Sequence, residues 1–118
     1  MYQGEIHPSQ DSAFKQFKSA AYGYRAMFVL LYTYRKKHGL DTLHQMISRY
    51  APPVENHTDN YIKSVCKWAE VEADVPIDTV SEEVMVPVVA AMSRMENGKA
   101  AVMADVKAGW DLFRRDFA

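Results

Sequence analysis

Apolar positions spaced by three and four residues recur along most of the chain and predict α-helices. The longest such pattern spans residues 19–38, where two largely apolar stripes run along one segment. Ser19 supplies a side-chain oxygen that can cap the first turn, and Gly39 follows three basic residues at the far end, a typical helix stop. Because both stripes are apolar, we expect this helix to be the buried, central one.

Further segments with helical periodicity are separated by residues that stop helices. We expect these helices at about 42–50, 58–70, 81–97 and 102–114. Pro52 and Pro53 end the first of them, and Gly98 ends the third. The valines around Pro87 make a short strand the alternative near the start of the helix expected at 81–97. Gly109 weakens the last one.

The first 18 residues lack helical periodicity and contain Gly4 and Pro8. We expect them to form a short irregular or β-like N-terminal arm, with Phe14 and Phe17 packed on the long helix. A chain of 118 residues has the length of one domain. The sequence therefore predicts a single all-α domain over residues 1–118, a compact bundle of four to five helices around a buried central helix.

Composition places the chain among ordinary globular proteins, with 48% hydrophobic and 25% charged residues. The net charge of -1 argues against a general affinity for nucleic acid. Residues 1–70 hold nine Lys or Arg against six Asp or Glu, a balance of +3, whereas residues 71–118 hold five against nine, a balance of -4. The two halves are expected to attract each other, with contact between the basic residues 35–37 and a polyanion as the alternative.

Several classes of site and segment lack a sequence pattern here. Cys66 is the single cysteine and falls on an expected buried face, so an inert core thiol is favoured over a nucleophile. The scattered histidines are His7, His38, His44 and His57. They show no metal-ligand spacing, and no glycine-rich phosphate loop occurs, so neither a metal nor a cofactor is expected.

The chain also lacks a recognisable membrane or export segment. The longest apolar stretch, residues 26–31, is far shorter than the ~20 residues of a membrane span. Residues 1–10 have neither the basic nor the apolar region of a secretory signal. We therefore expect synthesis in the cytoplasm and no membrane partner.

The densest polar cluster follows the second expected helix and is stiffened by Pro52 and Pro53. The candidate binding residues in and beside it are Arg49, Tyr50, Glu55, Asn56, His57, Thr58 and Tyr61. One interpretation is a rim that binds a partner. The other is structural: Asn56 or Thr58 caps the next helix, and Glu55 pairs with Arg49.

Two charged residues inside or at the end of apolar helices are further candidates. Arg25 must find a partner or reach solvent, so an ion pair or a carbonyl clamp is favoured over ligand binding. Glu96 follows an apolar stripe whose surroundings could hold a carboxyl group protonated as a general acid. The alternative is a solvated Glu96 at an ordinary helix end.

Several stretches, taken in order, resemble a family of proteins that phages and prophages encode and that are described as structural or virion proteins. The stretches are Phe-Lys-Gln-Phe at 14–17, Tyr-Gly-Tyr-Arg-Ala at 22–26, Leu-Tyr-Thr-Tyr at 31–34, residues 37–42 and 47–62, and, more weakly, Glu-Asn-Gly at 96–98. Family members usually have Trp where Tyr50 stands and carry an upstream segment rich in Asn, Pro and Arg. The resemblance covers nearly the whole chain, and the stretch 49–62 is its specific part.

Residues 14–31 are also similar, more loosely, to the core of cell-wall glycosidases of the lysozyme type. Such an enzyme needs a carboxylic general acid, and Glu55 and Glu96 are the internal candidates. The resemblance thus implies a virion-associated interaction protein whose rim contacts a protein partner or a cell-wall glycan. The alternative is a peptidoglycan-cleaving glycosidase or a degenerate relative; a nucleic-acid accessory protein fits the charge least. The oligomeric state stays open.

Overall fold

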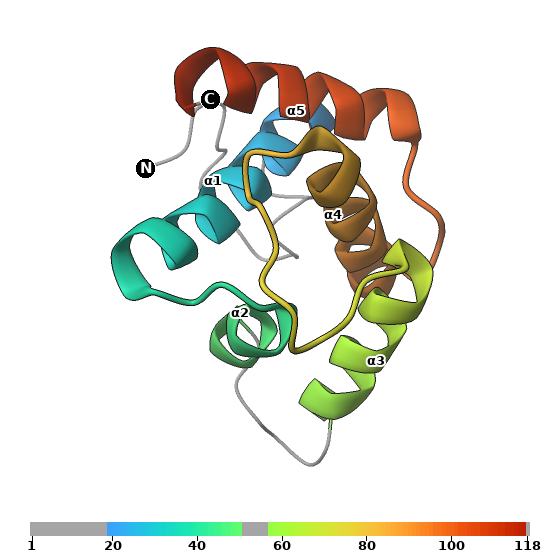
Figure 1. The fold of residues 1–118 in the computed structure, drawn as a ribbon. Coiled ribbons are helices and arrows are strands. Elements are labelled where there is room, and N and C mark those ends of the chain that lie inside the picture. Colours follow the sequence, from blue (N-terminus) through green and yellow to red (C-terminus); the bar gives the residue numbers. More distant parts are fainter. Residues whose placement is uncertain (1–18, 51–56, 118) are drawn as a thin grey trace, which may run out of the picture.

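The computed structural model describes residues 19–50 and 57–117, and within this part the chain forms five α-helices and no strand (Figure 1). The helices are α1 (Ala20–His38), α2 (Leu43–Tyr50), α3 (His57–Ala69), α4 (Glu82–Asn97) and α5 (Met103–Phe117). The all-α class and the approximate positions of all five helices are therefore confirmed. The expected N-terminal arm lies outside the described residues.

The ends of α1 are capped as the sequence indicates. The Ser19 side chain accepts a hydrogen bond from the Tyr22 amide at 3.5 Å. Gly39 has φ 66°, and its amide donates to the Tyr34 carbonyl. Gly98 ends α4 in the same way, with φ 72° and a 2.9 Å bond from its amide to the Arg94 carbonyl. Both glycines thus satisfy carbonyl groups that a helix end leaves free.

The helix α4 continues through Pro87, so the alternative of a short strand there is wrong. The reason is burial: Met85, Val88, Val89 and Met92 turn one helical face into the core, where each is fully enclosed. That packing outweighs the hydrogen bond that proline cannot donate and the strand preference of valine.

Aromatic rings from α1 and α5 form the centre of the core. The ring centroids of Phe28 and Trp110 lie 5.0 Å apart in an edge-to-face arrangement, and those of Trp110 and Phe113 lie 5.1 Å apart. In Figure 1, α5 runs across α1, while α4 lies beside α3 and α2 sits at the opposite end from α5. Helix α5 passes through Gly109, where it meets α1.

The segment from 70 to 81 joins α3 to α4 and is tied to the body by backbone bonds. The His44 amide donates to the Ala73 carbonyl at 2.9 Å, and the Ile77 amide donates to the Asp41 carbonyl at 2.8 Å. These bonds hold the segment against the connection between α1 and α2.

Ion pairs join the basic first half of the chain to the acidic second half. Arg25 lies 2.9 Å from Asp116, and Arg35 lies 3.7 Å from Asp78. The first of these pairs connects α1 to α5, and the second connects α1 to the segment before α4. The attraction expected between the halves is thus realised inside the fold.

Among the described helices, none combines the length and the apolar character that crossing a bilayer requires.

Candidate functional site

Three helices bring Tyr50, Tyr61 and Glu96 together, and we call this group the Tyr–Glu cluster. Tyr50, the last residue of α2, donates its hydroxyl hydrogen to Glu96 Oε1 near the end of α4. The rings of Tyr50 and Tyr61 lie edge to face, with centroids 6.1 Å apart. Two phenols and one carboxylate therefore lie together, although Tyr50 and Glu96 are 46 residues apart in the sequence.

Local structure positions each member of the Tyr–Glu cluster. Tyr61 occupies the buried face of α3, with only 9% of its surface exposed. Glu96 is half-buried just before the Gly98 helix stop. Tyr50 is also half-buried at the end of α2. Because two of the three residues stand at helix ends, the cluster depends on where those helices stop.

Burial and charge keep both phenols of the cluster protonated at neutral pH. Burial raises the pKa of Tyr50 well above its ordinary value of 10.0, and its hydrogen bond to Glu96 raises it further. Burial also raises the pKa of Tyr61, and the Glu96 charge adds to the effect. Each tyrosine is therefore available only as a neutral hydrogen-bonding group.

The hydrogen bond from Tyr50 bears on the chemistry open to Glu96. The bond uses Glu96 Oε1 as an acceptor, whereas a general acid must donate a proton to the reacting group. The geometry thus presents Glu96 as a hydrogen-bond acceptor, suited to hold a donor group of a partner.

The Tyr61 hydroxyl is enclosed and has no hydrogen-bond partner among the residues that the structure describes. Leaving a buried hydroxyl unpaired costs about 1–3 kcal/mol. Unpaired buried groups are uncommon in folded proteins and often mark places with a role beyond packing. By the distances and angles among the described residues, the Tyr61 hydroxyl therefore has hydrogen-bonding capacity to spare.

A second buried polar group, Ser93, lies one turn before Glu96 and was not singled out by the sequence. Its Oγ lies 3.0 Å from the Tyr24 hydroxyl and accepts a bond from Asn97 Nδ2 at 3.2 Å. Ser93 is 1% exposed, so these bonds satisfy it inside the core. The available signal was a lone serine on an otherwise apolar helical face.

Arg25 makes the ion pair that was the favoured alternative for it. Its guanidinium pairs with Asp116 at 2.9 Å and lies 5.6 Å from the centre of the Phe117 ring. The side chain of Arg25 is about nine-tenths buried by this contact. The pair consequently ties the start of α1 to the end of α5.

The structure places the other candidate binding residues unevenly. Arg49 and His57 are exposed, whereas Thr58 is 6% exposed inside the first turn of α3. Thr58 is the second residue of that helix, so its expected capping position is wrong. Glu55 and Asn56 lie outside the described residues, and their candidate roles stay predictions.

The remaining reactive groups are weakly placed for chemistry. Cys66 is half-buried, and burial, followed by the charges of Glu72 and Asp74, raises the pKa of its thiol. A raised pKa leaves less of the nucleophilic thiolate at neutral pH. Within the described ranges, no three His, Cys, Asp or Glu side chains come close enough to hold a metal ion.

Comparison with known proteins gives a phage relative. The chain is 33% identical to protein P5 of Pseudoalteromonas phage PM2 over 111 residues, which cover 93% of this chain and 68% of protein P5. No family model matches the chain. The similarity spans the helices that build the Tyr–Glu cluster, since it covers nearly the whole sequence.

Proposed function

The chain belongs to the family of protein P5 from Pseudoalteromonas phage PM2, and from this premise we propose that it is a phage- or prophage-derived structural protein that acts in the virion by binding another component. The observation that carries the proposal is sequence identity to a phage protein along almost the whole chain. A protein of this kind needs a stable helical body and a contact surface rather than a reaction centre.

The contact surface in this proposal is the rim expected from the sequence at residues 49–61, of which the structure describes 49, 50 and 57–61. Two of its described members, Arg49 and His57, are exposed. Arg49 directly precedes Tyr50 in the sequence, and His57 lies four positions before Tyr61. Tyr61 shows little of its ring, so it offers almost no flat face on which a sugar could stack. This favours a protein partner, reached by Arg49 and by the acceptor Glu96, over a cell-wall glycan.

The second candidate function is cleavage of peptidoglycan by a lysozyme-like mechanism. Its support is one observation: Glu96 is a half-buried carboxylate with two phenols beside it. A glycosidase of this kind places two carboxyl groups across the scissile bond. Glu96 Oε1 already accepts the hydroxyl hydrogen of Tyr50, which disfavours Glu96 as the proton donor of the pair. We therefore rank this function below the structural one.

The structural proposal is tested on particles of the virus that encodes the chain. Particles purified through a density gradient are analysed by quantitative mass spectrometry. We expect the protein to co-sediment with the coat in a fixed ratio through repeated gradients. Recovery only in the soluble lysate, with none in the particles, would contradict the proposal.

The enzyme alternative is tested with purified peptidoglycan, read for soluble fragments by mass spectrometry. Wild type is compared with Glu96→Gln, Glu55→Gln and the matched surface control Glu83→Gln. We expect no fragments from any of them. Fragments that wild type releases and that Glu96→Gln or Glu55→Gln alone abolishes would establish the hydrolase and identify its acid.

A further inference from the structure

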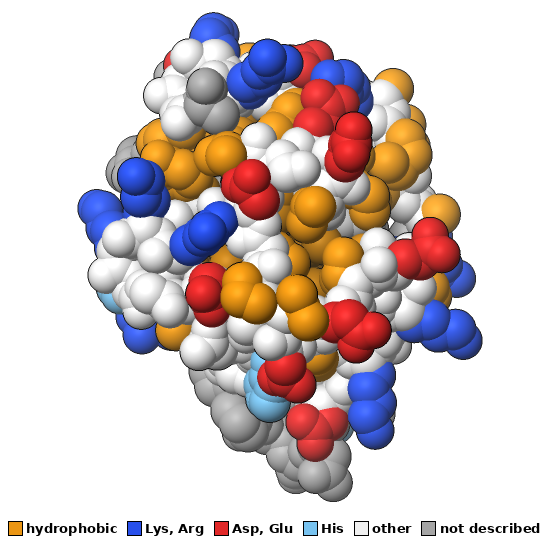
Figure 2. All heavy atoms as spheres, in the orientation of Figure 1, with side chains coloured by type: hydrophobic (Ala, Val, Ile, Leu, Met, Phe, Trp, Pro, Cys, Tyr) orange, Lys and Arg blue, Asp and Glu red, His pale blue; other side chains and the backbone are white. Residues whose placement is uncertain are grey.

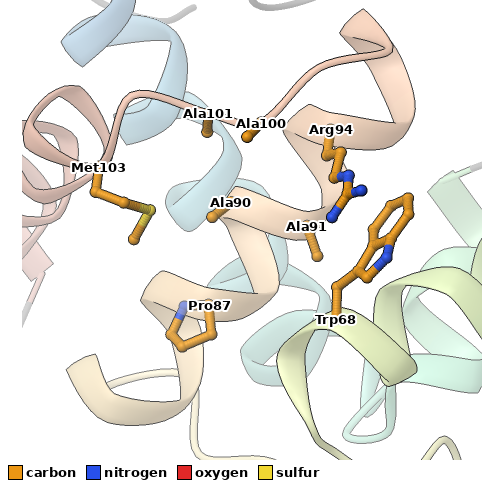
Figure 3. Close-up of a pocket in the computed structure, with 8 residues that line it drawn as sticks. All are labelled: Trp68, Pro87, Ala90, Ala91, Arg94, Ala100, Ala101 and Met103. Atoms are coloured by element: carbon orange, nitrogen blue, oxygen red, sulfur yellow. The ribbon is translucent and has the colours of Figure 1, made fainter.

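A pocket outside the Tyr–Glu cluster is lined almost wholly by apolar groups (Figure 3). It has a volume of about 300 Å³ and lies where the end of α3 meets α4 and the connection to α5. Trp68, Pro87 and Met103 line it together with four alanines, and Arg94 stands at Trp68. We call it the Trp68 pocket. A volume of this size lies at the lower end of those that accommodate a ligand.

The Trp68 pocket has a cation, Arg94, among the residues that line it. The guanidinium carbon of Arg94 lies 4.1 Å from the centre of the Trp68 ring, which is cation–π stacking. Figure 3 shows this stack at one side of the pocket. Among the described residues no carboxylate pairs with Arg94. A stacked guanidinium keeps its N–H groups available for a carboxylate.

The composition of the Trp68 pocket is that of a protein contact. Trp68 is 36% exposed and Met103 is 50% exposed, although both are large and apolar. Tryptophan, methionine and arginine are the side chains enriched at protein interfaces, and tryptophan and arginine dominate their energetics. Lys67 and Lys99 are exposed and stand next in sequence to the lining residues Trp68 and Ala100.

The same chain presents a segment of the opposite character. Residues 70–78, which we call the acidic loop, carry four acidic side chains and no basic one. Val75 is 53% exposed on this loop and is followed by Pro76, which restricts the backbone. Glu72 is exposed and has no ion-pair partner among the described residues. Figure 2 shows acidic side chains around apolar ones on this face of the molecule.

The acidic loop starts two positions after the lining residue Trp68, but its middle is tied to another part of the molecule. Its bonds to His44 and Asp41 hold it at the connection between α1 and α2. The Trp68 pocket lies instead between α3, α4 and the start of α5. Because Ala73 and Ile77 are tied there, Val75 between them reaches a Trp68 pocket only on another molecule.

We propose that the Trp68 pocket receives the acidic loop of a second copy of this chain, with Val75 in the apolar part and Glu72 paired with Arg94. The proposal rests on the proposed structural role and supplies its partner. Because pocket and loop are different surfaces, the contact is head-to-tail and repeats from copy to copy as a ring or an open array. The stiffened loop loses little conformational entropy on binding.

The test is sedimentation velocity of the full chain over a concentration series, at low and high salt. We expect wild type to associate, and to associate less at high salt because the contact is between opposite charges. Arg94→Glu and Val75→Lys should each weaken association at least about tenfold, as replacement of a central interface residue does. Val80→Lys is the matched control, an exposed valine (45%) outside the contact, and should associate as wild type.

Mixing the two variants distinguishes this contact from other modes of association. Arg94→Glu keeps an intact loop, and Val75→Lys keeps an intact pocket, so an equal mixture should form a one-to-one dimer and nothing larger. A monomeric wild type, a mixture that stays monomeric, or equal weakening by Val80→Lys would overturn the proposal. Any of these results leaves recovery of the protein in particles unaffected, so the structural role is judged separately.

Discussion

Gly109 of α5 lies directly against Tyr24 of α1, so closely that no side chain fits between them. A Cβ atom at Gly109 would stand 2.5 Å from Tyr24 Cβ, 2.8 Å from the Ala21 carbonyl oxygen and 2.9 Å from the Arg25 amide nitrogen. Two of these neighbours are backbone atoms, which cannot move without moving the helix. The absence of a side chain at this position therefore sets how closely α1 and α5 approach.

Gly109→Ala should lower the free energy of unfolding by about 2–3 kcal/mol, because the two helices must separate. In an exposed helix the same change would raise the free energy of unfolding by about 1 kcal/mol. A decrease therefore indicates the contact with α1. Urea denaturation measures the difference. The comparison is Gly39→Ala, where φ is 66° but no atom lies within 4 Å. Gly39→Ala should lose only the roughly 1–2 kcal/mol of its left-handed conformation. Unchanged or increased stability in Gly109→Ala would show that steric contact there is not limiting.

Glu70→Gly should stabilise the protein by about 1 kcal/mol. Glu70 follows α3 with φ 56°, a left-handed conformation that costs a residue with a side chain roughly 1–2 kcal/mol. Glycine adopts this conformation freely but loses more backbone entropy on folding, so part of the gain is offset. Thermal and urea unfolding report the change. Glu72→Gly, two residues further on and without positive φ, should be neutral or destabilising; a gain there of the same size would refute the explanation.

Tyr50→Phe should destabilise the fold by about 1–3 kcal/mol, because half-buried Glu96 loses its hydrogen-bond donor. Tyr61→Phe removes a buried hydroxyl with no partner in the described structure and should leave stability unchanged or raise it by up to about 1–3 kcal/mol. A double-mutant cycle of Tyr50→Phe with Glu96→Gln isolates the pair. Additive effects of the two changes would show that the bond contributes nothing.

Stability should fall at alkaline pH through the same two tyrosines. Their pKa values in the folded protein are raised above the ordinary 10.0. A raised pKa gives stability that is fully present below pH 10.0 and is lost as pH rises above it, because only the unfolded phenol ionises there. Urea unfolding between about pH 8 and pH 11 should show this loss. The double variant Tyr50→Phe/Tyr61→Phe should lose less; an identical pH profile would refute the assignment.

The helices could be predicted from the sequence because their signals are local. The periodic apolar positions of α1, the cap at Ser19 and the stop at Gly39 all act within one or two turns. The same holds for Gly98 at the end of α4. Pro87 is the exception, since the choice between helix and strand there was made by burial of the neighbouring valines, a tertiary effect.

The candidate sites were only partly accessible from the sequence. Tyr50, Tyr61 and Glu96 were each singled out, but as members of two unrelated sites. No pattern along the chain shows that the ends of α2 and α4 lie beside the first half of α3. Thr58 was taken for an exposed or capping residue, whereas the start of α3 at His57 turns it into the core.

Some features belong to tertiary structure alone. The Trp68 pocket joins residues from α3, α4 and the approach to α5, and the stack of Arg94 on Trp68 spans 26 positions of sequence. By itself the sequence determined the helical class, the helix ends and the separation of charge between the halves, because these depend on neighbours along the chain. Packing decided which polar groups meet, since contacts between distant residues depend on how closely helices approach, as Gly109 permits for α1 and α5.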